Sequence, residues 1–479
     1  MVLDDLVALL PLEVVAGFAL LAVLAIAFAR SHLLAALLSA AGLAIAFAAL
    51  WVALPATPRQ VTALFVLDSF SLFYVGVLLA AAIAVVALAY GYLERQRVHR
   101  EEFYLLLLVA TLGSATLAAS NHFASFFLGL ETLSISLFAL LAYPRTVRGS
   151  VEAGIKYLIL ASASSAFLLF GMVLIYAELG TMQFDRIAQT LGTVSGDLLV
   201  LAGLSMLVVG IGFKLAVVPF HMWTPDVYQG APAPATAFLA TVSKGGMFAL
   251  LLRFFTQVDV RSYGSMVIAF SLIAIASMLG GNLLALQQNN VKRILAYSSI
   301  AHVGYMLVAF LAGGTLGISA ATFYLAAYFV TILAAFGVVT VLSTGNEEAE
   351  SIDHYRGLFY QRPFPAVVLT VALLSLAGMP LTAGFIGKFY LVTAGVSVFW
   401  WLLVVVLVLS SAISLFYYLR VVSAVYQRPT VEAPARPVSA STQWAGGLVL
   451  AALALLLLWL GVYPGPMIEA IQATVGALL

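Results

Sequence analysis

Four lysines and a glutamate stand inside long apolar stretches of this 479-residue sequence, where charged side chains are rare. They are Glu131, Lys156, Lys214, Lys244 and Lys388. A charged group at the centre of a membrane helix costs about 2.5–3.5 kcal/mol on insertion scales. Because burial disfavours the charged form of a side chain, such residues can exchange protons near neutral pH. A single buried lysine is often a structural cation, but the group as a whole predicts a charge relay within a membrane.

The candidates differ in depth and in local partners. Glu131 and Lys244 stand close to the middle of their stretches, whereas Lys156 lies about one and a half helical turns from an end. Glu152 precedes Lys156 by four residues, in the orientation that favours an ion pair on a helix, so Lys156 has a local structural partner. His302 lies shortly after two serines in another stretch and is a further candidate for proton transfer.

Lys214 and Lys388 each stand near glycines and prolines that interrupt a helix. Pro219 follows Lys214, and Pro380 precedes Lys388. The stretch 363–395 would be about 50 Å long as one helix, too long for a bilayer, so we expect a break near Pro380. Paired interrupted helices in two halves of a chain are typical of inverted-repeat transporters and their ion sites. Prolines also kink membrane helices for packing reasons alone.

Other polar residues in these stretches have structural explanations. We expect His221 and Asp226 to satisfy backbone groups that the first break frees. Carboxylates near span ends are expected to be solvated, namely Glu13, Asp68 and Glu178. Tyr324 and Tyr328 have the i, i+4 spacing of ordinary helix packing, and Lys292 is expected in an ordinary loop position.

The composition is that of a membrane protein made of helices. Hydrophobic residues make up 64% and charged residues 9%, whereas soluble proteins have about 25% charged residues. Disorder, coiled coils and strongly basic nucleic-acid binding are excluded. With no cysteine, the chain cannot hold disulfides, cysteine-ligated iron–sulfur clusters or zinc–thiolate sites. It has no Walker A loop, complete dinucleotide turn or metal-ligand cluster, so partner subunits or an ion gradient must supply energy.

Hydropathy predicts an all-α integral membrane protein with about fourteen transmembrane helices, each near the roughly 20 residues that cross a bilayer. The spans are 7–28, 32–54, 70–92, 102–119, 122–143, 152–177, 197–220, 229–255, 263–286, 293–313, 318–343, 363–395, 399–425 and 444–465. The sizeable extramembrane pieces are 178–197, 346–356 and 427–436. The first span begins with acidic residues and lacks a convincing cleavage site, which is unlike a signal peptide.

Lysine and arginine are unevenly shared between the loops on the two sides, thirteen against four. The richer side holds Arg30, Arg95, Arg97, Arg100, Arg145, Arg148, Lys292, Arg293, Arg356, Arg362, Arg420, Arg428 and Arg436. The poorer side holds Arg59, Arg186, Arg253 and Arg261. By the positive-inside rule the richer side is cytoplasmic, which places both termini on the outer side.

Several runs of residues closely resemble the signature of one family. The longest extends over 212–234 and contains Thr-Pro-Asp-Val-Tyr-Gln-Gly-Ala-Pro. Shorter runs are Gly-Leu-Glu-Thr-Leu-Ser at 129–134, Ile-Lys-Tyr at 155–157, Ser-Ser-Ile-Ala-His-Val-Gly-Tyr at 298–305 and Gly-Phe-Ile-Gly-Lys-Phe-Tyr at 384–390. Over essentially the whole chain the sequence resembles the subunit N family of bacterial NADH:quinone oxidoreductase, respiratory complex I.

The resemblance implies two inverted five-helix repeats with broken helices, at 102–260 (helices 4–8) and 261–427 (helices 9–13). Three helices at 1–101 would precede them, and a loop with the last helix would follow at 428–479.

In such a subunit, redox chemistry in a partner arm would shift a coupled pair, Glu131 and Lys214. The charge change would pass through Lys244 and His302 to Lys388 and so translocate protons. Lys156 is a weaker candidate for the same relay.

The resemblance also implies a setting. The chain would be a multi-pass subunit of the bacterial cell inner (cytoplasmic) membrane, in contact with the lipid bilayer. Its partners would be the antiporter-like subunit M and the small membrane subunits J, K and A, and nucleic acid would not be one. No cofactor is expected in this chain, because NADH, FMN, iron–sulfur clusters and quinone would belong to partner subunits.

Two other functions remain open from the residues. The chain could be a subunit of a cation/proton antiporter, which shares the glutamate and lysine positions. The 224–232 run and the lack of a long amphipathic extension after residue 465 favour the oxidoreductase instead. A structural membrane anchor would leave about 10 kcal/mol or more of buried-charge cost without a purpose.

Overall fold

The computed structural model describes residues 3–96, 99–144, 147–191, 198–343, 348–428, 440–476 and 478. The α-helices are α1 (Leu3–Phe28), α2 (His32–Ala53), α3 (Ser69–Leu93), α4 (Glu101–Ala119), α5 (Phe123–Leu141), α6 (Arg148–Leu179), α7 (Phe184–Leu191), α8 (Leu198–Leu215), α9 (Trp223–Gly230), α10 (Ala233–Phe238), α11 (Lys244–Gln257), α12 (Gly264–Leu286), α13 (Val291–Ala312), α14 (Gly314–Leu342), α15 (Leu358–Gln361), α16 (Pro363–Ala377), α17 (Ala383–Ser397), α18 (Trp401–Tyr426), α19 (Ala440–Val462) and α20 (Gly465–Val475). Shorter elements are the 3-10 turns η1 (Leu54–Ala56), η3 (Val260–Ser262) and η4 (Ile352–Tyr355), the π-helical turn η2 (Leu239–Ser243), and the antiparallel hairpin of β1 (Arg59–Val61) and β2 (Phe65–Leu67).

The expected transmembrane architecture is confirmed. In the described part of the chain, twelve helices are long and apolar enough to cross a membrane, with α10, η2 and α11 forming one of them. The shorter apolar helices α16 and α17 correspond to the expected twelfth span, and the break between them contains Pro380. α19 supplies the last span, and α20 turns away from it by 80°. The spans therefore agree with the approximately fourteen that hydropathy predicts.

Some expected features lie outside the described residues. They are Arg97, Arg145, Arg436 and parts of the expected loops 178–197, 346–356 and 427–436.

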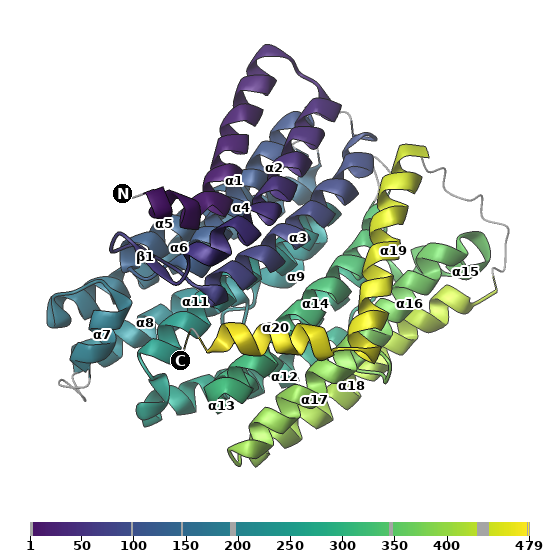
Figure 1. Ribbon diagram of the computed structural model, residues 1–479. Helices are drawn as coiled ribbons and strands as arrows, with labels where there is room; N and C mark the ends of the chain where they lie inside the picture. The colour runs from purple at the N-terminus through teal and green to yellow at the C-terminus, as the bar shows by residue number, and fades with distance from the viewer. Residues whose placement is uncertain are drawn as a thin grey trace.

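The spans form one bundle in which helices from the two halves of the chain pack against each other. Figure 1 shows the N-terminal helices in purple and blue beside α12 to α18 in teal and green. The helices α9 and α13 contact each other across the middle, as do α10 and α14. α20 runs crosswise to α19 and packs against α3 and α14 (Figure 1).

Three spans at the centre are almost wholly enclosed by protein. The apolar window of the α10–α11 span is 100% buried, and those of α13 and α14 are each 94% buried. They carry Lys244, His302 and Tyr324 respectively. Because hydrocarbon cannot satisfy polar groups, a membrane bundle must place such side chains where other protein groups surround them. Two of the candidates, Lys244 and His302, therefore lie on the most buried helices.

The sequence-based expectations for Arg253 and Asp68 are wrong. Arg253 lies inside α11 rather than in an outer loop, and Asp68 is buried rather than solvated. The guanidinium donates from Nη1 to Asp68 Oδ2 at 2.9 Å and from Nη2 to Asp68 Oδ1 at 2.8 Å. Asp68 also caps α3, where its Oδ1 accepts from the Ser71 N–H at 2.7 Å. This ion pair joins α3 to α11, two elements far apart in the sequence.

We expect Arg253→Met to lower the thermal stability of the purified complex strongly. Removing one partner of a buried ion pair typically costs about 3–5 kcal/mol, since it leaves an uncompensated charge. The comparison is Arg261→Gln, because the Arg261–Asp259 pair is 38% and 56% exposed and should contribute little. Equal thermal stability of the two variants would show that the buried pair does not hold α3 against α11.

Candidate functional site

Lys214 lies at the point where α8 stops. The chain leaves the helix at Ala216, whose φ of 62° is left-handed, and the Val218 N–H donates to Ser277 Oγ of α12 at 2.9 Å. Lys214 is 3% exposed, and its Nζ donates to Ser134 Oγ at 2.9 Å and to Tyr157 Oη at 2.8 Å. The break therefore presents a buried ammonium to two hydroxyls, one from α5 and one from α6.

Glu131 lies one turn from Ser134 on α5, on the same side of the bundle as Lys214. Its Oε1 accepts a hydrogen bond from Ser165 Oγ of α6 at 2.6 Å. The ion pairs of the described residues do not include Glu131 with Lys214. Any coupling between the two charges therefore acts over a distance rather than through a direct ion pair.

Lys244 begins α11 immediately after the π-helical turn η2. Single π turns inside helices are frequently found at functional sites. Lys244 is 1% exposed, and its Nζ donates to Ser299 Oγ of α13 at 2.6 Å. Tyr328 Oη of α14 donates to the same serine oxygen at 2.7 Å. One hydroxyl group therefore links the first half of the chain to two helices of the second.

His302 lies one turn beyond Ser299 on α13 and is bonded at both ring nitrogens. Its Nδ1 is 2.7 Å from Tyr324 Oη of α14, and its Nε2 is 3.2 Å from Tyr418 Oη of α18. Tyr418 also hydrogen-bonds Ser298. Tyr324 and Tyr328 have the spacing of ordinary packing, and the structure shows that their hydroxyls also bond His302 and Ser299. A neutral imidazole with a hydroxyl on each side can accept a proton on one nitrogen and release one from the other.

Lys388 lies in α17 and reaches across the break in the second broken span to the end of α16. Its Nζ donates to the carbonyl oxygens of Leu376 and Ala377, both at 2.9 Å, and to Ser411 Oγ of α18 at 2.7 Å. The two carbonyls belong to the last turn of α16, where the helix dipole favours a cation. Gly378 ends α16 with a φ of 84°, and a Cβ there would lie 2.8 Å from Lys388 Cδ. Glycine is therefore required at this position for both its backbone angle and its lack of a side chain.

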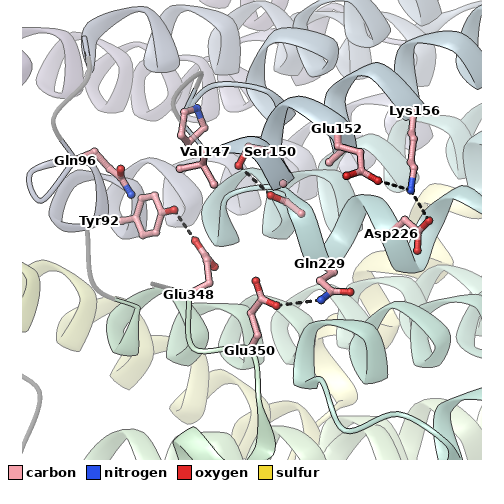
Figure 2. A pocket seen from close by; sticks show the side chains of 14 residues that line it. Tyr92, Gln96, Val147, Ser150, Glu152, Lys156, Asp226, Gln229, Glu348 and Glu350 are labelled. Atoms are coloured by element: carbon pink, nitrogen blue, oxygen red, sulfur yellow. Dashed lines mark hydrogen bonds and ion pairs between the residues drawn. The ribbon is translucent and has the colours of Figure 1, made fainter. Parts of the chain in front are cut away.

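Lys156 has carboxylate partners. Its Nζ lies 2.8 Å from Glu152 Oε1, as the four-residue spacing predicts, and 2.9 Å from Asp226 Oδ2. Asp226 was expected to satisfy backbone groups, but it instead binds Lys156 and Arg293, the latter at 2.8 Å. Glu152, Lys156 and Asp226 line a cavity of about 370 Å³, which is bounded by the ends of α3, α6 and α9 and by Glu348 and Glu350. Figure 2 shows Glu152, Lys156 and Asp226 on one side of this cavity and Glu348 on the other.

The hydroxyl partners are the part of the site that sequence reasoning missed. They are Ser134, Tyr157, Ser299, Tyr324, Tyr328, Ser411 and Tyr418. Their only sequence signal is a hydroxyl side chain within an apolar helix, which ordinary packing also produces. Over the described ranges, no three His, Asp or Glu side chains come together as a metal site would require.

Known protein sequences resemble this chain over most of its length. Residues 120–414 match the family model described as "NADH:quinone oxidoreductase/Mrp antiporter, TM". The NADH-quinone oxidoreductase subunit N of Ectopseudomonas mendocina is 48% identical over 477 residues, which cover 98% of this chain and 96% of that protein.

Solved structures give the same fold. A chain of respiratory complex I from Thermus thermophilus with bound aureothin is 34% identical, with a TM-score of 0.83, and the match covers 97% of this chain and 100% of that one. A chain of the Mrp complex from Dietzia sp. has a TM-score of 0.87 over 100% of this chain and 98% of that one. Its identity is 22%, so that likeness concerns the fold alone.

Proposed function

We propose a proton route for this chain, which belongs to the subunit N family of NADH-quinone oxidoreductase and is an antiporter-like membrane subunit of the proton-pumping enzyme. In this route, protons cross the membrane through Glu131, Lys214, Lys244, His302 and Lys388. Redox energy released elsewhere in the complex changes the charge near Glu131 and Lys214. That change favours proton transfer along the buried side chains toward Lys388, from which the proton leaves.

One observation carries this proposal. Within the described ranges, Lys214, Lys244 and Lys388 donate only to hydroxyl and carbonyl oxygens. Lys156 and Lys292 instead contact carboxylates. A carboxylate holds its lysine in the charged form, whereas a neutral acceptor leaves the lysine free to lose and regain a proton. The test is proton pumping by the whole complex in lipid vesicles, with these lysines replaced one at a time.

The path contains gaps that side chains of the described residues do not bridge. Lys214 bonds to α5 and α6, whereas Lys244 bonds to α13. Two buried hydroxyls have no hydrogen-bond partner: that of Thr224, beside the first broken span, and that of Ser114 in α4, which packs against Gly246 of α11. Buried polar groups of this kind are commonly satisfied by ordered water. We therefore propose that water molecules carry protons between the lysines.

The two broken spans support a division of the chain into repeats. We assign 102–260 and 261–427 to two inverted five-helix repeats, flanked by 1–101 and 428–479. Lys214 then stands at the break of the first repeat and Lys388 at the break of the second. Lys244 of the first repeat bonds Ser299 of the second, which links the two repeats. In each repeat the break supplies freed backbone groups beside a buried ammonium, as ion sites of inverted-repeat transporters do.

The setting follows from family membership. The chain is a multi-pass membrane subunit of a respiratory complex. We propose that it lies in the bacterial inner membrane beside subunits M, J, K and A. NADH, FMN, iron–sulfur clusters and quinone are proposed to bind to other subunits, and Lys156 is proposed to have only a minor part in proton transfer.

We predict that both termini lie on the outer side. The natural chain has no cysteine, so single cysteines report orientation cleanly. Gln427→Cys, just after α18, should react with a membrane-impermeant maleimide only from the cytoplasmic side. Ser262→Cys, between α11 and α12, should react only from outside, and both positions are exposed. The opposite pattern in intact cells would invert the topology.

A further inference from the structure

Lys292 was expected in an ordinary loop position, but it is fully buried in the first turn of α13. Its Nζ donates to the carbonyl oxygen of Ala231 at 2.6 Å and to Glu348 Oε2 at 3.1 Å. Ala231 lies in the short junction between α9 and α10, and Pro232 follows it. An ammonium from the second half of the chain thus binds the backbone of the first half, beside its broken span.

Glu348 brings further elements to the same point. Its Oε1 accepts from Tyr92 Oη of α3 at 2.5 Å and from the Ala233 N–H at the start of α10 at 3.4 Å. The Glu348 side chain is 18% exposed, while the Lys292 side chain is 0% exposed. The carboxylate therefore ties α3, α10 and α13 together through one buried cation and two neutral donors.

Glu350, two residues further on, extends these contacts. Its Oε2 accepts from Asn290 Nδ2 at 2.8 Å and from Gln229 Nε2 of α9 at 3.2 Å. Its carbonyl oxygen accepts from the Val291 N–H at 2.6 Å. Figure 2 shows Glu350 reaching Gln229 and Glu348 reaching Tyr92 across the polar cavity. The segment 348–350 is thus bound to both α9 and the start of α13.

We propose that Lys292 and Glu348 form a clamp between the two repeats that positions the α9–α10 junction, and through it Lys214 and Lys244, for proton transfer. The junction lies between the broken span that carries Lys214 and the span that carries Lys244. The segment with Glu348 leads into α16 and α17, which carry Lys388. A displacement of either repeat at this point would move one lysine relative to another. The proposal rests on the proposed proton route, to which the clamp adds two positioning residues.

The clamp makes a distinctive demand on Lys292. A positioning cation needs its charge and its donors but never needs to lose a proton, and arginine supplies both. Lys292→Arg should therefore keep most of the pumping. Lys292→Met and Glu348→Gln should each lower the pumping rate per assembled complex by about threefold, within the range that mutations along a coupling network produce. The KM for quinone should not change, since no quinone contact is touched.

The experiment uses the whole complex in vesicles, with pumping measured per assembled enzyme. The double variant Lys292→Met/Glu348→Gln should lose about as much as the more severe single variant, because both changes break the Lys292–Glu348 ion pair. Asp353→Asn is the matched control, since its carboxylate lies in the same region but is 70% exposed. Tyr92→Phe removes the hydrogen bond from Tyr92 to Glu348 and reports on the clamp if Lys292→Met does not assemble.

The outcomes separate the clamp from the proton route. The clamp is overturned if Lys292→Met and Glu348→Gln both pump fully. If Lys292→Met does not assemble, full pumping in Glu348→Gln and Tyr92→Phe overturns it. Less assembled complex with a normal rate per complex also overturns it, because the contacts would then serve stability alone. Loss in Lys292→Arg equal to that in Lys292→Met overturns it too, since Lys292 would itself be titrating. Normal pumping in the Lys214 and Lys388 variants would instead refute the proton route.

Discussion

Lys388→Arg is expected to leave the complex assembled but to lower NADH-driven proton pumping by about tenfold or more, since positioned proton transfer commonly contributes roughly 10²-fold or more. Arginine retains a charge and hydrogen-bond donors for the last carbonyls of α16 and for Ser411. It effectively cannot release a proton, however. A release site must alternate between charged and neutral forms, whereas a structural cation at a helix end need not.

The matched comparison is Lys292→Arg, in which the replaced lysine contacts a carboxylate and should tolerate the change. Pumping is measured in lipid vesicles and normalised to the amount of assembled complex. Wild-type pumping in assembled Lys388→Arg would leave Lys388 as a support for the broken helix.

The broken spans and their lysines were predictable because they violate the rules of a membrane helix. A lysine inside an apolar stretch is costly, and a stretch of 363–395 is too long for one span. The structure has breaks after Lys214 and before Lys388, beside Pro219 and Pro380. Hydropathy and proline positions are local properties, so the sequence alone reveals them.

Contacts between distant helices were not predictable from local patterns. Tyr324 and Tyr328 have the spacing of packing residues, and only the position of α13 beside α14 makes them partners of His302 and Ser299. Lys292 lies near a span end, where solvation is the usual state. It is buried because Ala231 and Glu348, from distant parts of the chain, contact its ammonium.

The ion pair of Arg253 with Asp68 shows the same limit. Each residue is near the end of an apolar stretch, and each was expected to face water. Their separation of 185 residues leaves no pattern that a single sequence can reveal. Charged residues in or near apolar stretches can therefore be recognised from the sequence, but their partners cannot.

Glu131→Ala and Lys214→Ala are expected to depress quinone-linked turnover and pumping together, by about tenfold or more, while assembly persists. Both residues bond to hydroxyls around α5 and α6, so loss of either should interrupt the same step. The double variant should be no worse than the more severe single one. Lys156→Ala should lose less, since Lys156 is 41% exposed and held by two carboxylates.

The most direct measurement compares the rate of proton pumping with the rate of NADH oxidation in vesicles that hold assembled Lys214→Ala complex. We predict that both rates fall together, because electron transfer in a coupled enzyme cannot continue when its proton path is cut. Normal rates of both at normal assembly would contradict the proton route and leave Lys214 as a structural residue of the first broken span.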